Sequence, residues 1–173
     1  MTLVLTLLVV ITLLALFFDF TNGFHDSSNI VATMISSRAM SPLQALLMAA
    51  TAEFIGAYFL GTAVAKMMGK GIVDPQYLQD LQASYIIIAT LIAAIGWNLL
   101  TWYFGIPSSS SHALIGGLVG AFIVARGMGI INWLNVGMIF VVLITSPLIG
   151  GLAGAAITRF CRWFFRFAPP AAN

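Results

Sequence analysis

Long apolar runs alternate with two short polar islands along this chain. The runs cover about residues 2–18, 43–68, 84–104, 113–126 and 133–157. Most of them are about 20 residues long, which is the length of α-helix that crosses a hydrocarbon core of about 30 Å. The pattern therefore predicts an all-α polytopic membrane protein with about five hydrophobic segments.

Composition and charge support this prediction. Hydrophobic residues make up 61% of the 173 residues and charged residues only 7%, whereas soluble domains carry about 25% charged residues. The net charge of +2 comes from scattered Lys and Arg, so we expect a lipid bilayer as the surroundings and no nucleic acid as a partner. The single cysteine, Cys161, excludes an internal disulfide and a cysteine-based metal cluster.

The first polar island covers residues 19–29 and holds two carboxylates, an imidazole and two carboxamides. On a helix, four of these side chains would share one stripe, with the imidazole beside it: Asp19, Asn22, Asp26 and Asn29, next to His25. Ionisable groups at membrane depth cost roughly 2.5–3.5 kcal/mol each and usually face a cavity, a partner or an ion. The island is thus a candidate ion site, and Gly23 within it predicts a break in the first helix.

The second island covers residues 105–112 and precedes an apolar run of only about 14 residues. A run this short predicts a re-entrant half-helix after Pro107, since irregular backbone at membrane depth needs protein or water around it. Serines are good helix N-caps, and the N–H groups and dipole at a helix N-terminus favour an anion. We therefore expect four serines to bind an oxyanion: Ser108, Ser109, Ser110 and Ser111.

Two chemically different islands in one apolar chain predict a transporter that couples an oxyanion to a cation. Carboxylate and amide oxygens in the first island suit a hard cation or a proton relay, and broken helices near the bilayer midplane are the usual way to provide both sites. Glu53, in the middle of the second apolar run, is a further candidate for ion or proton coupling. The alternative is that Glu53 is a paired or protonated group within the bundle.

Other interpretations of these residues are less well supported. The serines could serve only as caps and turns, and His25 and His112 could be hydrogen-bonded core residues. An intramembrane serine hydrolase is disfavoured because Ser111 and His112 are sequence neighbours, which do not face each other on a helix, and no G-x-S-x-G pattern occurs. No H-E-x-x-H spacing indicates a metal-dependent enzyme. We therefore expect neither an enzyme nor a resident cofactor.

The two islands together resemble the signature motifs of a known family. Gly23-Phe24-His25-Asp26-Ser27-Ser28-Asn29 resembles the G-A-N-D-x-A-N signature of the inorganic phosphate transporter (PiT) family in its bacterial G-F-H-D form. Pro107-Ser108-Ser109-Ser110-Ser111-His112-Ala113 resembles its P-x-S-[ST]-[ST]-H motif. The resemblance implies a phosphate symporter of the bacterial plasma membrane, built from two inverted repeats that each carry both motifs.

The resemblance also implies roles for individual residues. Asp26 and Asn29 would belong to the cation and phosphate site as candidate sodium ligands, with Asn22 beside them, and the serines would donate to phosphate. His25 stands where the other form of the signature has Asn, so the coupling ion stays open between sodium and a proton. The substrate would be inorganic phosphate, either free or as a complex with a divalent metal.

The chain carries one copy of each motif, where the family usually has two. The resemblance therefore implies that residues 1–168 form a single transporter repeat, followed by a loose tail at 169–173. Such a repeat would be a fragment, or a half-length protein that pairs with a second half or with another copy of itself, and we expect no transport by the chain alone. The alternative is a structural or regulatory membrane subunit that does not transport.

Overall fold

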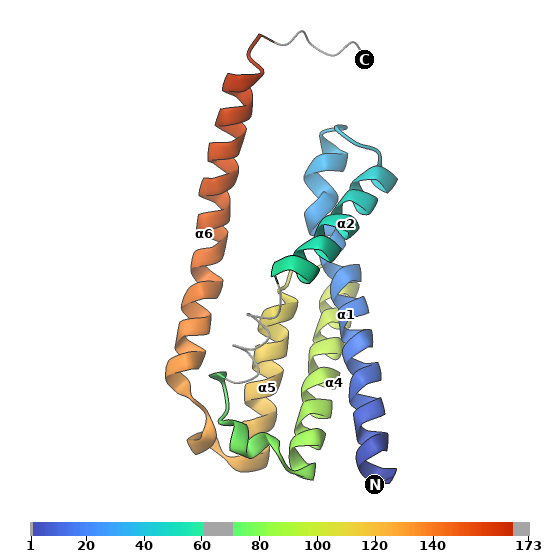
Figure 1. The fold of residues 1–173 in the computed structure, drawn as a ribbon, viewed down its shortest axis with the longest axis vertical. Coiled ribbons are helices and arrows are strands. Elements are labelled where there is room, and N and C mark those ends of the chain that lie inside the picture. Colours follow the sequence, from blue (N-terminus) through green and yellow to red (C-terminus); the bar gives the residue numbers. More distant parts are fainter. Residues whose placement is uncertain (1, 61–70, 168–173) are drawn as a thin grey trace. The chain divides into compact units, whose positions relative to one another are not determined.

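The protein is helical throughout most of its length, as the apolar runs predicted. The computed structural model describes residues 2–60 and 71–167, and the predicted tail at 169–173 lies outside this part of the chain. The α-helices in the described ranges are α1 (Thr2–Ser36), α2 (Pro42–Leu60), α4 (Leu81–Tyr103), α5 (Ser110–Arg126) and α6 (Trp133–Phe164), with short 3-10 helices η1 (Pro75–Leu78) and η2 (Met128–Ile130) (Figure 1). Helices α1, α4 and α6 are long and apolar enough to cross a membrane.

The chain divides into two compact units, Met1–Asn132 and Trp133–Asn173. The second unit consists mainly of α6, which continues through Pro147 over its 32 residues. The first unit holds the other helices and both polar islands. In it α4 packs against both α1 and α5, and α1 also packs against α2.

Helix α1 has no break, so the predicted interruption of the first helix is wrong. The helix runs from Thr2 to Ser36 straight through Gly23. A glycine inside a helix costs only about 1 kcal/mol relative to alanine, which does not stop a 35-residue helix that packs against two neighbours. The hydroxyls of Ser27 and Ser28 donate to the carbonyl oxygens of Phe24 and His25, each at 3.2 Å. The first island therefore lies on an intact helix.

Helices α4 and α5 form a hairpin whose connection contains the second island. Gly105 in this connection has a φ of +64°, in the left-handed region that glycine adopts without strain. Helix α5 begins at Ser110, and the Ser109 hydroxyl accepts a hydrogen bond from the His112 N–H at 3.4 Å. The serine run thus caps a helix, as predicted, and the 17 residues of that helix are fewer than in the three long apolar helices. Its re-entrant course in a membrane stays a prediction.

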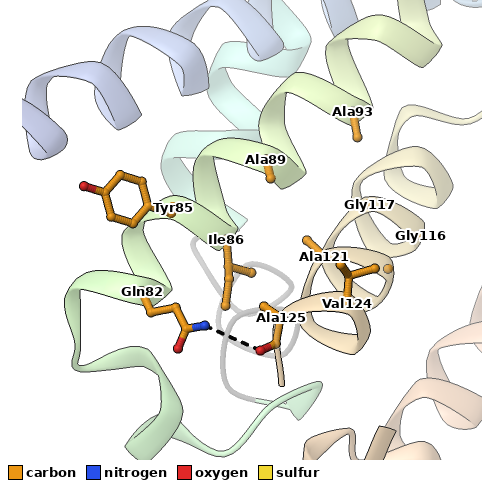
Figure 2. A pocket seen from close by; sticks show the side chains of 11 residues that line it. Gln82, Tyr85, Ile86, Ala89, Ala93, Gly116, Gly117, Ala121, Val124 and Ala125 are labelled. Atoms are coloured by element: carbon orange, nitrogen blue, oxygen red, sulfur yellow. Dashed lines mark hydrogen bonds between the residues drawn. The ribbon is translucent and has the colours of Figure 1, made fainter. Parts of the chain in front are cut away.

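Close packing holds this hairpin together. A Cβ atom added at Gly117 would lie 3.1 Å from the Thr90 carbonyl oxygen, which is a tight contact, so glycine at this position eases the close approach of the two backbones. Figure 2 shows the groove along the hairpin, in which small residues of α4 and α5 face each other and Gln82 Nε2 donates to the Ala125 carbonyl oxygen at 3.4 Å. On its other side α4 buries Leu91, Ala94 and Ile95 against Phe18 of α1.

Candidate functional site

The structure brings the two polar islands together. Ser110 Oγ, in the first turn of α5, donates to Asp26 Oδ2 of α1 at 3.4 Å, although the two residues are 84 positions apart. On the same carboxylate, Oδ1 lies 2.9 Å from His25 Nδ1. His25 and Ser110 are buried, whereas 35% of the Asp26 side chain stays exposed. Asp26 is therefore held by both islands and still accessible to an ion.

Thr101 links the islands a second time, and it was not predicted as a site residue. Its Oγ1 lies 3.3 Å from His25 Nε2 and accepts a hydrogen bond from Ser108 Oγ at 2.9 Å. The Thr101 hydroxyl itself donates to the Trp97 carbonyl oxygen at 2.9 Å. Polar contacts thus connect Ser108 through Thr101 and His25 to Asp26. One threonine in an apolar run gives no local signal of this role.

A pocket of about 330 Å³ lies beside this network. Its wall combines the first island, the end of α4 and the connection to α5, and consists of His25, Ser28, Asn29, Thr101, Trp102, Gly105, Ile106 and Pro107. Asn29 and Ser28 are exposed. The pocket thus presents carboxamide, hydroxyl and imidazole groups of the first island next to the N-terminus of α5.

The other predicted site residues take different positions. Ser108 is half-buried, Ser111 is exposed, and Ser109 serves as the cap of α5. Asn22 is half-buried, and its Oδ1 is buried without a hydrogen-bond partner. Asp19 is exposed and takes no part in the hydrogen bonds found among the described residues of the site.

Glu53 lies apart from this network. It is exposed on α2 and lines a second pocket, of about 340 Å³, together with Gly23 and Ser27 of α1. Helix α1 therefore presents polar groups to two neighbours, one set toward α4 and α5 and another toward α2. Among the described residues, no group of three or more His, Cys, Asp or Glu side chains is placed to hold a metal ion.

Asn98 is a second polar residue that was not predicted for the site. It lies in α4, is 1% exposed, and neither its Oδ1 nor its Nδ2 has a hydrogen-bond partner. Buried polar side chains nearly always have a partner. Asn98 lies one turn before Thr101, and its unpartnered carboxamide indicates that this part of α4 does not serve only to pack against its neighbours.

At the opposite end of the hairpin, Asp80 ties α4 to α5. Its carboxylate caps α4 by accepting from the Ala83 N–H at 2.9 Å, and it also pairs with the Arg126 guanidinium. The Ala83 hydrogen bond first, and Arg126 second, hold the pKa of the Asp80 carboxyl below its usual value. This ion pair lies outside the site and connects the two helices of the hairpin.

Comparisons with known proteins point to the same family as the two motifs. The family model described as "Phosphate transporter family" matches residues 22–172. A "Probable low-affinity inorganic phosphate transporter" of Streptomyces halstedii is 47% identical over 96% of this chain and 76% of its own length. A protein of the same description from Bacillus subtilis is 46% identical over 95% of this chain and 48% of its own length.

The fold is similar to that of a solved transporter. A structure titled "The sodium-dependent phosphate transporter" matches 91% of this chain with a TM-score of 0.82 and 32% sequence identity, and the match covers 40% of that protein. The chain thus spans about three quarters of the Streptomyces relative, and half or less of the Bacillus relative and of the solved transporter.

Proposed function

Because the chain belongs to the phosphate transporter family, we propose that it binds inorganic phosphate and helps to carry it across a membrane together with a cation. The observation that carries this proposal is the contact between Ser110 and Asp26, which joins a helix N-terminus, where an anion is favoured, to an acid. The apolar helices and the family identify an integral membrane protein, and the bacterial relatives favour the plasma membrane.

Phosphate would bind at the N-terminus of α5, next to the pocket lined by Ser28 and Asn29. There the free N–H groups and the helix dipole favour an anion, and Ser110 and Ser108 supply hydroxyls. The Ser109 hydroxyl accepts a hydrogen bond from the His112 N–H, so the other serines would contact phosphate.

The nearby carboxylate explains why a cation must accompany the anion. Two like unit charges 4 Å apart repel by about 4 kcal/mol at an effective dielectric constant of 20. Phosphate bound beside Ser110 would meet this repulsion from Asp26. A sodium ion or a proton on the carboxylate removes the repulsion, so the anion binds well only when the cation is present.

We place this chain as one half of the transport unit. It carries one copy of each motif, and it spans 48% of the Bacillus relative and 40% of the solved transporter. A second half, whether further sequence of the same polypeptide, another copy of this chain or a separate polypeptide, would complete the site. Residues 1–168 then act as a single transporter repeat.

Uptake of labelled phosphate by proteoliposomes tests both parts of the proposal. Vesicles that hold only this chain should take up no more phosphate than empty vesicles, and vesicles that also hold a second half should show cation-dependent uptake. Uptake by this chain alone that Asp26→Asn abolishes would refute the half-transporter assignment. Lack of uptake with every second half, together with lack of phosphate binding, would favour a structural or regulatory subunit instead.

A further inference from the structure

The end of α6, drawn in red in Figure 1, carries three arginines without an acid beside them in the sequence. The acids of the chain are Asp19, Asp26, Glu53, Asp74 and Asp80, so residues 81–173 contain none. Arg159, Arg162 and Arg166 are exposed, and the ion pairs found among the described residues do not include them. This part of the helix therefore carries a positive charge that no carboxylate of α6 compensates.

The three arginines share one side of the helix. Arg162 follows Arg159 by three positions and precedes Arg166 by four, and residues at these spacings are neighbours on a helix surface. The helical hydrogen bonds continue as far as the Phe165 N–H, which donates to the Cys161 carbonyl oxygen at 2.9 Å. Like charges at such spacings repel each other. The negative end of the helix dipole offsets this repulsion in part, and an anion bound across the arginines would relieve it further.

The position of the arginines along α6 fits the edge of a membrane. Residues 134–157 of this helix contain no charged side chain, and they measure about 36 Å at 1.5 Å per residue. The hydrocarbon core of a bilayer is about 30 Å thick. A helix that crosses the core with this segment therefore brings Arg159 and the residues after it to the level of the lipid headgroups, where the phosphodiester groups lie.

Aromatic side chains around the arginines suit the same level. Trp163, Phe164 and Phe167 are exposed, and tryptophan favours the interface between membrane and water. Arg166 Cζ lies 5.6 Å from the centroid of the Trp163 ring and 4.7 Å from that of Phe167. A guanidinium held over ring faces keeps its charge and its N–H donors. The end of α6 thus combines groups that prefer the interface with donors for an anion.

The chemistry of the guanidinium group selects an anionic phospholipid as the ligand. Arginine binds phosphate oxygens through two parallel N–H···O hydrogen bonds. A zwitterionic lipid neutralises its phosphodiester with its own ammonium group, whereas an anionic lipid keeps a net negative charge that clustered arginines attract. Inorganic phosphate offers the same oxygens, but exposed charges hold a dissolved ion weakly because salt screens them. Lipids present their phosphates at a fixed depth and at a high local concentration.

We propose that Arg159, Arg162 and Arg166 form a binding site for the headgroup of an anionic phospholipid at the end of α6. The three residues belong to the second compact unit, whereas the residues of the proposed phosphate site belong to the first. The inference goes beyond the proposed function and does not rest on it. Lipid binding is measured without transport, so a failure of this inference and a failure of the proposed function are distinguishable.

The experiment uses the single cysteine of the chain as a reporter. Cys161 is exposed and lies between Arg159 and Arg162 in the sequence, so a donor fluorophore on its thiol marks this end of α6. The purified full chain is placed in vesicles of phosphatidylcholine and phosphatidylglycerol, with an acceptor fluorophore on the acyl chain of one lipid or the other at the same low fraction. Energy transfer should reveal a preference for phosphatidylglycerol of about tenfold or more.

A pair of matched variants assigns this preference to the arginines. Arg162→Gln should lower the preference about three- to fivefold, as expected for one arginine at an anionic membrane surface. Arg38→Gln removes the same charge in the connection between α1 and α2 and should leave the preference unaltered. Both arginines are exposed, so neither change removes a buried contact, and circular dichroism checks that the helices are retained.

Two additions to the unaltered chain complete the test without any substitution. Sodium chloride should weaken the preference, because salt screens exposed charges. Inorganic phosphate should have no more effect than sodium chloride at the same ionic strength. Equal transfer to the two labelled lipids, equal effects of Arg162→Gln and Arg38→Gln, or displacement of the lipid by inorganic phosphate beyond the salt effect would overturn the proposal.

Discussion

At the scale of single residues, Asp26 is an acid in the middle of a long apolar helix. It sits on a membrane helix, accepts from Ser110 and contacts His25, and yet 35% of its side chain is exposed. An acid in such a place is expensive unless a partner or an ion compensates its charge. The two hydrogen bonds compensate it in part, and the accessible portion is left for a ligand.

Replacing Asp26 by Asn tests the electrostatic link between cation and phosphate. The amide keeps the size and removes the charge, so phosphate no longer meets a repelling carboxylate. We expect the cation dependence of phosphate binding to fall by at least about tenfold. Equilibrium binding of labelled phosphate, with and without sodium and at several pH values, measures it.

The control is Asp74→Asn, the same change in an acid that caps η1 outside the site. It should leave the cation dependence unaltered. If Asp26→Asn and Asp74→Asn proteins responded alike, the carboxylate next to Ser110 would have no part in coupling.

Replacing Ser110 by Ala tests the proposed phosphate site directly. The variant loses a buried hydroxyl of that proposed site and should lower phosphate affinity roughly 5- to 15-fold, as expected for one hydrogen bond of about 1–1.5 kcal/mol. Isothermal titration with phosphate provides the measurement. Ser146→Ala is the matched control, because that hydroxyl donates to the Leu143 carbonyl oxygen within α6. A similar loss in both variants would contradict a role specific to Ser110.

At the scale of elements, the hairpin of α4 and α5 is the frame on which the site is assembled. Its open end carries the serine connection, and its other end is tied by Asp80 and Arg126. Helix α1 adds the acid and the imidazole by packing against α4. Anything that loosens the hairpin should therefore loosen the site as well.

The Asp80 pair gives the hairpin a defined dependence on pH. Because the folded state lowers the pKa of this carboxyl, its stabilising contribution is present above the unfolded pKa of about 3.8 and is lost as pH falls through the lower folded value. Asp80→Ala should thus lower the Tm at pH 7, and the difference from the unaltered chain should shrink below about pH 4. Thermal unfolding across this range measures it, and a difference that does not change with pH would contradict the assignment.

Two adjacent glycines test the packing of the hairpin. Gly116→Ala meets no atom within 4 Å and should stabilise α5 by up to about 1 kcal/mol through helix propensity. Gly117→Ala places a Cβ 3.1 Å from the Thr90 carbonyl oxygen, and overpacking of this kind costs about 1–3 kcal/mol. We therefore expect a lower Tm for Gly117→Ala than for Gly116→Ala. Equal values would show that the hairpin tolerates the added methyl group.

At the scale of the whole molecule, the chain is rich in large apolar side chains that its own fold leaves exposed. On α2, for example, Phe54, Tyr58 and Phe59 are each more than 70% exposed. In a membrane, lipid would cover such surfaces, and under the proposed function a second transporter half would cover part of them. Glu53 lies on this same exposed helix, so its role in ion coupling stays a prediction that depends on what covers α2.

Sequence patterns predicted the helices better than their contacts. Apolar runs and the Pro107 and serine caps were sufficient to locate α4 and the start of α5, because these signals are local. The meeting of Ser110 with Asp26 depends on how α1 and α5 both pack on α4, which no local pattern encodes. Single polar residues within apolar runs, Thr101 and Asn98, were missed for the same reason.

Asp19 shares the predicted stripe, because the seven residues that separate it from Asp26 make about two full turns of the helix. Its carboxylate is exposed and is not part of the pocket that Asn29 borders, so its role in ion coupling stays a prediction. The break expected at Gly23 does not occur, because the free-energy cost of one glycine in a helix is small compared with the stabilisation that a 35-residue helix gains by packing.

The double contact of Thr101 has a consequence for how ligand access and ion occupancy depend on each other. Ser108 lies in the connection between α4 and α5, which borders the pocket, and His25 contacts the carboxylate of Asp26. Both residues contact the Thr101 hydroxyl. Any rearrangement of the connection must therefore break these contacts or carry His25 with it. Under the proposed function, a cation at Asp26 would thus change the affinity for phosphate beside the connection, and by thermodynamic reciprocity phosphate would change the affinity for the cation by the same factor.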